Sequence, residues 1–266
     1  MTEHAPLPKG IDANKLDWPN LMQEALTMPG GLGNTYNRFY QYSFNNQILL
    51  FLQGVTEPVA TYDRWKEMGR QVKKGSQAKS ILRPIIRNEL DDEGKEYKRL
   101  TGFKFVRCLF TASETVGDEL EPYEPPEWSK ERALGNLAIR EVPFVGLNGN
   151  VQGYSKDREV AISPVAKDPF PTLLHEIGHI ALGHTSKEGM AEYSTHNRRG
   201  LMEFQAESVS YLAGHELGAY SESVAAESRD YIQSWLKDAK PSDTDIRQVF
   251  GATDRILKAG RLEAAA

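Results

Sequence analysis

The feature that most constrains this chain of 266 residues is the motif His-Glu-Ile-Gly-His at 175–179. Apolar residues recur around it with helical spacing, and Gly183 is a typical helix end, so we expect an amphipathic helix over 169–182. Residues four apart on a helix share a face, so the imidazoles of His175 and His179 can bind one metal ion. The second half of the chain must therefore fold around a helix that carries a metal on its polar face.

We expect the third metal ligand to be a glutamate, because histidine is scarce after the motif and the single cysteine lies before it. Glu203 and Glu207 share one face of a helix predicted over about 198–213. We assign Glu203 to the metal and Glu207 to a hydrogen bond with a ligating imidazole. The reversed assignment and a helix on which both carboxylates are solvated remain alternatives. His184 follows the end of the motif helix and is expected to point away from the site.

Two histidines and one glutamate leave a fourth position open for water, which is typical of a catalytic zinc site. The expected reaction is hydrolysis of a peptide bond, in which Zn²⁺ polarises the carbonyl. Glu176 takes a proton from water and passes it to the leaving amine. Strands are expected over 142–163, and those over 151–163 could offer an edge to an extended peptide. The sequence does not rank the candidates for stabilising the oxyanion, which are Tyr193, His196, Tyr211 and His215.

Two other interpretations of the motif are weaker. Its histidines could pair with carboxylates in a protein core and bind no metal. A metal-dependent nuclease is the other, but an HExxH motif with a distant glutamate lacks the aspartate-rich site that suits Mg²⁺.

The net charge of −5 conceals two opposed blocks. Residues 61–110 contain 13 basic and 7 acidic side chains, whereas residues 111–180 contain 6 and 12. The total charge argues weakly against a nucleic-acid partner, but that argument does not hold for the basic block. The two blocks are therefore expected to have different partners.

Prolines and glutamates at 119–127 separate these blocks and favour unpaired backbone. We expect an α+β fold in two domains, over 14–118 and 131–262, joined by a linker over 119–130. Further helices are expected over about 133–140, 223–238 and 243–259, the last beginning at Ser242 and Asp245.

The first domain is predicted to contain a helix from Ser43 to Gln53, a short helix over 61–68, and a β-hairpin over 79–110. Phe44, Phe51 and Trp65 are predicted to lie in its core. Basic residues continue along the hairpin, where alternate positions could follow phosphates. They are Arg83, Arg87, Lys98, Arg99, Lys104 and Arg107.

Several short motifs follow one another in the first half. A Tyr-Ser-x-Asn-Asn segment at 42–46 precedes Trp65, a Gly-Arg pair at 69–70 and a Lys-Lys-Gly turn at 73–75. This order resembles the N-terminal single-stranded-DNA-binding domain of ArdC-type antirestriction proteins. At Glu114 the sequence has glutamate where that family usually has glutamine. With the basic block, the resemblance gives as DNA-binding candidates Tyr42, Asn45, Asn46, Trp65, Arg70, Lys73, Lys74 and Arg83.

The second half, over 172–184, 203–212 and 231–236, is similar to the zincin-like metallopeptidase domain of the same proteins. The resemblance implies a mobile-element or phage protein that protects incoming DNA from restriction, with single-stranded DNA and an unknown protein substrate as partners. No secretory signal or membrane-spanning segment is visible, so we expect it to act in the cytoplasm of a bacterial host. A non-proteolytic DNA-binding protector, in which the metal domain is a scaffold, is the competing hypothesis.

Overall fold

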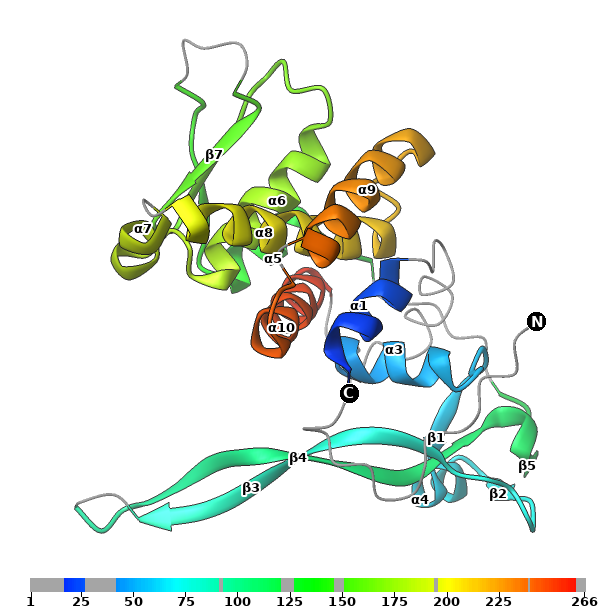
Figure 1. Ribbon diagram of the computed structural model, residues 1–266. Helices are drawn as coiled ribbons and strands as arrows, with labels where there is room; N and C mark the ends of the chain where they lie inside the picture. Colours follow the sequence, from blue (N-terminus) through cyan, green and yellow to red (C-terminus); the bar gives the residue numbers. More distant parts are fainter. Residues whose placement is uncertain are drawn as a thin grey trace. The chain divides into compact units, whose positions relative to one another are not determined.

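The computed structural model describes residues 17–26, 42–90, 93–120, 127–145, 151–193, 196–238 and 240–261. The chain divides into two compact units (Figure 1). The first comprises residues 1–17 and 34–123, and the second comprises residues 18–33 and 124–266. Within the described residues, no helix is both long and apolar enough to cross a lipid bilayer.

The first unit is a mixed unit of short helices and antiparallel strands. A sheet of order β1-β4-β3 lies against α3, and β2 pairs with β5. Its elements are α3 (Phe44–Leu52), β1 (Val59–Thr61), α4 (Tyr62–Glu67), β2 (Arg70–Val72), β3 (Lys79–Leu90), β4 (Glu96–Thr111), the 3₁₀ helix η2 (Ala112–Glu114) and β5 (Thr115–Gly117). Leu50 of α3 packs with Ile81 and Leu109 of the sheet in the core.

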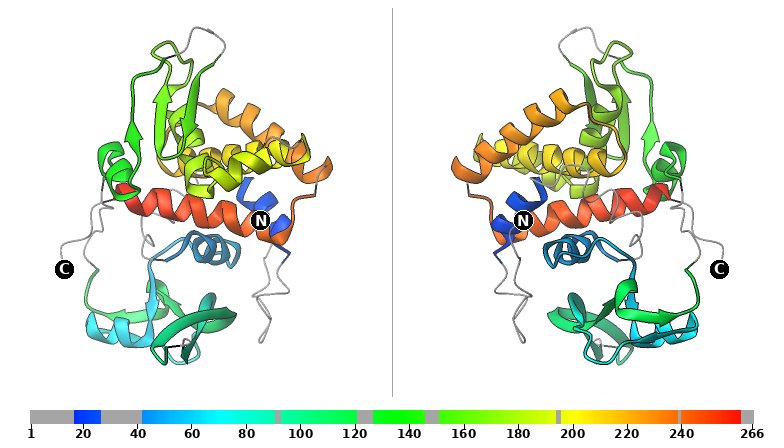
Figure 2. Two further views of the ribbon diagram at one scale, coloured as in Figure 1. Left: turned by 90° about the vertical axis from the view of Figure 1, so that its left-hand side faces the viewer. Right: turned by 90° about the vertical axis from the view of Figure 1, so that its right-hand side faces the viewer.

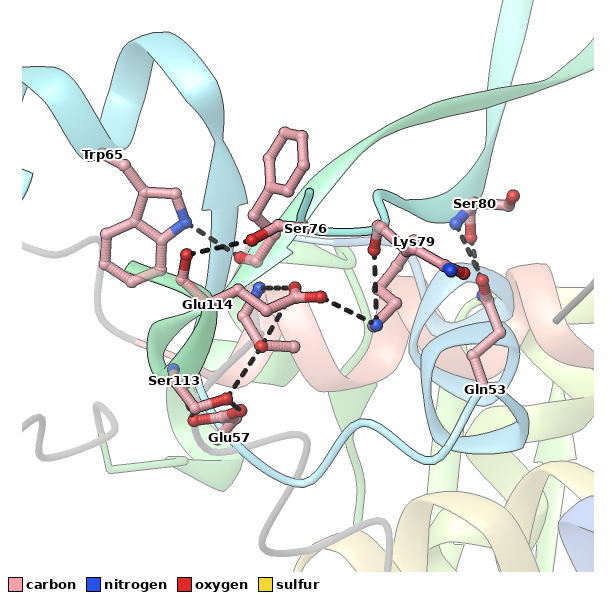
Figure 3. Close-up of polar contacts among 11 residues, drawn as sticks. Gln53, Glu57, Trp65, Ser76, Lys79, Ser80, Ser113 and Glu114 are labelled. Carbon is pink, nitrogen blue, oxygen red and sulfur yellow. Dashed lines mark hydrogen bonds and ion pairs between the residues drawn. The ribbon is translucent and has the colours of Figure 1, made fainter. Parts of the chain in front are cut away.

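Two side-chain amides, one in α3 and one directly after it, cover the open edge of β3. The side chain of Asn46 donates to the carbonyl of Leu82 at 2.9 Å and accepts from its N–H at 2.7 Å. Gln53 makes the same pair of bonds with the backbone of Ser80, both at 2.8 Å (Figure 3). Because an unpaired strand edge exposes backbone donors and acceptors, these amides act in place of a further strand.

The predicted hairpin over 79–110 is present as a long two-stranded ribbon of β3 and β4, drawn in cyan and green in Figure 1. Its base is buried at Ile81 and Leu82, but from Arg83 outward nearly every residue of β3 is exposed. A register shift between Ile85 and Ile86 marks a bulge partway along it. The outer ribbon therefore has two free faces.

Glu114, which replaces the family's usual glutamine, joins the end of β4 to the start of β3. Its carboxylate accepts hydrogen bonds from the N–H and hydroxyl of Thr111 at 2.8 and 3.1 Å, which completes a capping box for η2. Its other oxygen lies 3.3 Å from Lys79 Nζ (Figure 3). A glutamine could cap the turn, but only glutamate adds the half-buried ion pair.

The second unit is mainly helical, with one small sheet of order β6-β8-β7 (Figure 2). Helix α6 packs on α8, which in turn contacts α9 and α10. Its elements are α1 (Trp18–Leu26), α5 (Lys130–Asn136), β6 (Arg140–Glu141), β7 (Gly153–Lys156), β8 (Glu159–Ile162), α6 (Pro169–Leu182), α7 (Lys187–Tyr193), α8 (His196–Glu216), α9 (Glu222–Asp238) and α10 (Asp243–Gly260).

The division of the chain differs from the expected one at its beginning. Residues 18–33 belong to the second unit, although we expected 14–118 to form one domain. The apolar side chains of α1 explain the difference, because Trp18 and Met22 are buried and the helix packs on α10 and α9. Tyr211 of α8 also donates a hydrogen bond to the carbonyl of Leu26 at 3.1 Å.

The predicted helix boundaries are confirmed for α10 and differ for α5. The predicted start of α10 is confirmed, since Ser242 and Asp245 form a capping box. The helix expected over 133–140 instead occupies Lys130–Asn136, because Ser129 caps it earlier and Ala138 takes a positive φ of 52°.

Candidate metal centre

Helix α6 places the HExxH motif against α8. It begins with Pro169 at its first position and ends at Gly183, whose φ of 82° is left-handed, so the predicted limits 169–182 are confirmed. Gly178 inside the motif lets the helices approach closely. A Cβ on it would lie 3.3 Å from the carbonyl oxygen of Ala206.

Three of the predicted residues come together as a group that could hold a metal ion: His175, His179 and Glu203. The two Nε2 atoms are 3.1 Å apart, and they lie 3.4 and 3.6 Å from Glu203 Oε2. Ligand atoms about 2.0–2.1 Å from a tetrahedral Zn²⁺ are separated by about 3.3 Å. The three side chains therefore fit one tetrahedral ion.

Glu207 lies behind His175, on the side away from the other two ligand atoms. Its Oε2 is 3.0 Å from His175 Nδ1, and Ser228 donates to its Oε1 at 2.5 Å. Because a carboxylate only accepts, His175 carries a proton on Nδ1, and Nε2 is the ring nitrogen that could bind a metal ion in place of a proton. This geometry matches the role assigned to Glu207 from the sequence.

Electrostatics around His175 favour a cation. Burial alone lowers the pKa of His175, but hydrogen bonds to Glu203 and Glu207 outweigh it and raise the pKa to about 10. Burial also opposes the charge on Glu207, yet its bonds to His175 and Ser228 leave its pKa below the usual range. A positive charge is thus stabilised where a metal would bind.

His184 does not point away from the site, as we expected, but lies against His179. Its Nδ1 is 3.0 Å from His179 Nδ1. The cause is the turn after Gly183, in which the N–H of His184 bonds back to the carbonyl of His179 at 2.9 Å. This is the Schellman motif, which brings the second residue after a helix onto the residue five positions earlier.

The protons along this contact have fixed positions. The Nε2 of Gln205 donates to the Asp245 carbonyl at 3.4 Å, so its Oε1 is the atom that faces His184. His184 Nε2 lies 3.2 Å from this acceptor and therefore carries a proton. Burial, with the nearby His179, lowers the pKa of His184 to about 4, so its ring is neutral and Nδ1 accepts. His179 therefore donates from Nδ1, and its Nε2, like that of His175, is the ring nitrogen that could bind a metal ion.

Glu176 is held by the strand beside the motif helix. Ser155 of β7 donates to its Oε2 at 2.6 Å. Pockets of about 350 and 290 Å³ adjoin the site, and Gly153, His175 and Glu176 line both. Glu176 therefore lies where two parts of a bound chain could meet.

Two of the four candidates for stabilising an oxyanion are not brought to these pockets. Tyr211 is buried and bonded to Leu26, and His215, which stacks on Tyr220, lines neither pocket. The side chains of Tyr193 and His196 lie outside the described residues. Tyr220, which sequence reasoning missed, lines the larger pocket beside Glu207. No spacing pattern linked it to the motif.

Two of the residues proposed to bind DNA are buried in the first unit. Trp65 is 1 % exposed, as its predicted core position requires, and its Nε1 donates to the Phe110 carbonyl at 2.8 Å (Figure 3). Asn46 is 7 % exposed and uses both ends of its amide on Leu82. Neither side chain offers a surface to DNA.

The remaining DNA-binding candidates differ in how far they are already engaged. Arg70 donates to Thr115 and to the Asp118 carbonyl, and Lys73 donates to the Ser113 carbonyl at 2.7 Å. Asn45 is half-buried, as is Tyr42, whose pKa burial raises to about 12. Lys74 and Arg83 are exposed, and Arg83 also makes a side-chain hydrogen bond with Cys108.

Comparisons with known proteins agree with this architecture. The family model for the N-terminal domain of anti-restriction factor ArdC matches residues 13–109. The metal-free crystal structure of the antirestriction protein ArdC from plasmid R388 is 19 % identical, with a TM-score of 0.51, over 92 % of this chain and 96 % of that one. Its Mn(II)-bound structure is 16 % identical, with a TM-score of 0.52, over 92 % and 98 %. No curated protein matches the chain. Residues 13–109 thus belong to the ArdC N-terminal domain family, and the chain is an ArdC-type protein in its fold.

Proposed function

We propose that the second unit is a zinc-dependent, zincin-like peptidase. The observation that carries the proposal is the group His175, His179 and Glu203, with Glu176 beside it and two adjoining pockets. Two imidazoles and one carboxylate are a ligand set of catalytic zinc sites. ArdC of plasmid R388 has been crystallised with Mn(II), so the identity of the ion is part of the test.

The chain's own residues have distinct tasks in this reaction. A bound zinc ion would act as a Lewis acid toward the peptide carbonyl. Glu176 would take a proton from the attacking water and give it to the leaving amine, while the hydroxyl of Ser155 holds its carboxylate in place. β7 is an edge strand, paired only with β8 among the described residues, and could pair with an extended peptide.

We further propose that the first unit binds single-stranded DNA and that the protein protects a mobile element from restriction in the cytoplasm of a bacterial host. Support comes from the basic block at 61–110 and from the match to the ArdC N-terminal domain. Of the residues suggested by the sequence, exposed Lys74 and Arg83 are the best placed to contact phosphates. Arg70 and Lys73 keep part of their donors for the fold.

The decisive experiment replaces Glu176 by glutamine, which keeps the size of the side chain but cannot take the proton. We expect cleavage of a peptide library to fall about 10²–10⁴-fold, with the zinc content near one ion per chain unchanged. Cleavage that persists in Glu176→Gln would refute the assigned mechanism. As a matched control, Glu188→Gln alters another glutamate of the same unit and should leave cleavage unchanged.

A non-proteolytic protector is the second candidate, and one observation favours it. The R388 relative that the chain resembles is named for antirestriction alone. Transfer of unmodified DNA into a restricting host separates the candidates. Protection that survives Glu176→Gln favours the protector, and protection that is lost favours the peptidase.

A further inference from the structure

The outer part of the β3–β4 ribbon carries most of its cations on one side. The register pairs Arg83 with Lys104 and Arg87 with Arg99. Residues paired directly across antiparallel strands share a face, and residues two apart along a strand share it as well. These four cations therefore form one surface, which we call the basic face. Its two pairs are four positions apart along β3, a distance of about 13 Å in an extended strand.

The opposite side of the same ribbon has another character. Its cross-strand pairs are Pro84 with Phe103, Ile86 with Leu100, Asn88 with Lys98, and Leu90 with Glu96. We call this side the apolar face. Ile86 and Leu100 are 53 % and 54 % exposed, and the charges of Lys98 and Glu96 cancel. Charge on the ribbon is thus separated by face.

The basic face is arranged unfavourably for the isolated protein, because like charges stand directly opposite each other in both pairs. Glu89 shares this face, lies 3.1 Å from Arg99 and interacts electrostatically with Arg87 as well, so a single carboxylate offsets part of the charge of that pair. Among the described residues, no carboxylate lies within ion-pair distance of Arg87 or Lys104. An anion lying along the ribbon between the two strands would relieve both repulsive pairs.

We propose that the basic face binds the sugar–phosphate backbone of single-stranded DNA. The proposal rests on the DNA-binding function proposed for the first unit and moves the main contact from the motif residues at 42–75 to the ribbon. Charge complementarity is its basis, since phosphates are the anions that repeat along an extended chain. The positions of the aromatic side chains indicate whether the contact is to phosphates or to bases.

Few aromatic side chains beside these cations could stack on bases, since Tyr42, which interacts electrostatically with Arg83, is half-buried. Phe103 and Phe105 lie on the other side of the ribbon, and Trp65 is buried. Tyr97 is the aromatic residue of the basic face, and its hydroxyl donates to Glu89 at 3.0 Å. Without a stacking platform, the contact is to phosphates and does not select a base sequence.

The test measures binding of a labelled single-stranded oligonucleotide to the full chain at several salt concentrations. Each phosphate contact contributes about −0.7 to the slope of log K against log salt, so the basic face predicts about −2 to −3. Removing two cations in Arg87→Gln/Lys104→Gln should reduce the slope by about 1.4 and weaken binding roughly 25-fold near 0.1 M salt. Two oligonucleotides of unrelated sequence should behave alike.

The control removes the same charge elsewhere in the unit. Lys66→Gln/Lys98→Gln alters an exposed lysine of α4 and one on the apolar face. We expect its affinity and slope to match those of the wild type. An equal loss in both double variants would overturn the proposal, because the binding would then follow total charge and not the basic face.

The remaining outcomes separate this proposal from the proposed function. A wild-type chain that binds no single-stranded DNA overturns DNA binding as a whole. Binding that is normal in Arg87→Gln/Lys104→Gln leaves DNA binding standing but rejects the basic face. Loss of binding in Ile86→Ser/Leu100→Ser alone would assign the DNA to the apolar face instead. The melting temperature of each variant checks folding, and removing Lys104 should not lower it, because a repulsive pair is lost.

Discussion

The metal centre of the second unit and the basic ribbon of the first unit show how differently two candidate sites are encoded. At the metal centre, each ligand lies on a helix, and a spacing of four residues is enough to place two side chains on one face. On the ribbon, the face of each cation depends on strand register and on a bulge between Ile85 and Ile86. The sequence therefore predicts which residues meet at the metal centre. For the ribbon it predicts only that basic residues occur, not which face they share.

Burial adds to this difference. His175, Glu203 and Glu207 are partly buried polar side chains. Their polar partners are one another, because His175 pairs with both glutamates. In the first unit, polar and aromatic residues of the shared motifs are used for folding, as Asn46 and Trp65 show. Agreement with a family motif thus brings together a possible metal-binding group in the second unit and reflects the fold in the first.

The largest effect on zinc affinity is expected at Glu203, the proposed third ligand. Glu203→Gln removes a charged oxygen that lies 3.4 and 3.6 Å from the two imidazole nitrogens. We expect zinc affinity, measured by competition with a chelator, to fall more than about 100-fold. Glu207→Gln keeps an acceptor for the Nδ1 proton of His175, so its loss should be only about tenfold.

The opposite order of effects would show that Glu207 binds the metal and Glu203 orients a ligand. Equal, negligible effects would mean that both carboxylates act only as solvated or structural groups. Both substitutions remove one negative charge from the same face of α8, so each serves as the control for the other.

A smaller effect, in stability, is expected at Asn46 of the first unit. Asn46→Ala leaves the N–H and carbonyl of Leu82 without their partners at a buried strand edge, which should cost about 2–3 kcal/mol of unfolding free energy. Urea denaturation measures it, with Asn45→Ala, a half-buried neighbour, as the control. The affinity of the folded Asn46→Ala protein for single-stranded DNA should be unchanged. If Asn46→Ala lowered the affinity for DNA without lowering stability, Asn46 would have to contact DNA.

Much of the fold could be predicted because its signals are local. The limits of α6 follow from Pro169 and Gly183, and the start of α10 from Ser242. The assignment of α1 to the second unit could not be predicted, because an amphipathic helix does not reveal which core receives it. Likewise, a hairpin sequence shows alternation but not the bulge that sets the faces of the outer ribbon.

At the candidate metal centre, the sequence predicted the three residues that the structure brings together but misplaced His184. A usable signal was present, since a histidine directly after a helix-ending glycine is brought back onto the residue five positions earlier. That residue is His179, a ligand, so the turn itself supplies its hydrogen-bond partner. Ser155 and Tyr220 had no such signal, because each reaches the site from a separate element.

The smallest effect tests whether His184 acts on the metal through the tautomer of His179. His184→Ala leaves the Nδ1 proton of His179 without an acceptor, and we expect zinc affinity to fall about tenfold. In His184→Asn the amide oxygen can take the place of Nδ1 and accept that proton, so affinity should return to within about threefold of the wild type. Asparagine as damaging as alanine would show that the ring is needed for packing. An alanine variant with unchanged affinity would show that the chain from Asp245 through Gln205 to His184 does not reach the metal.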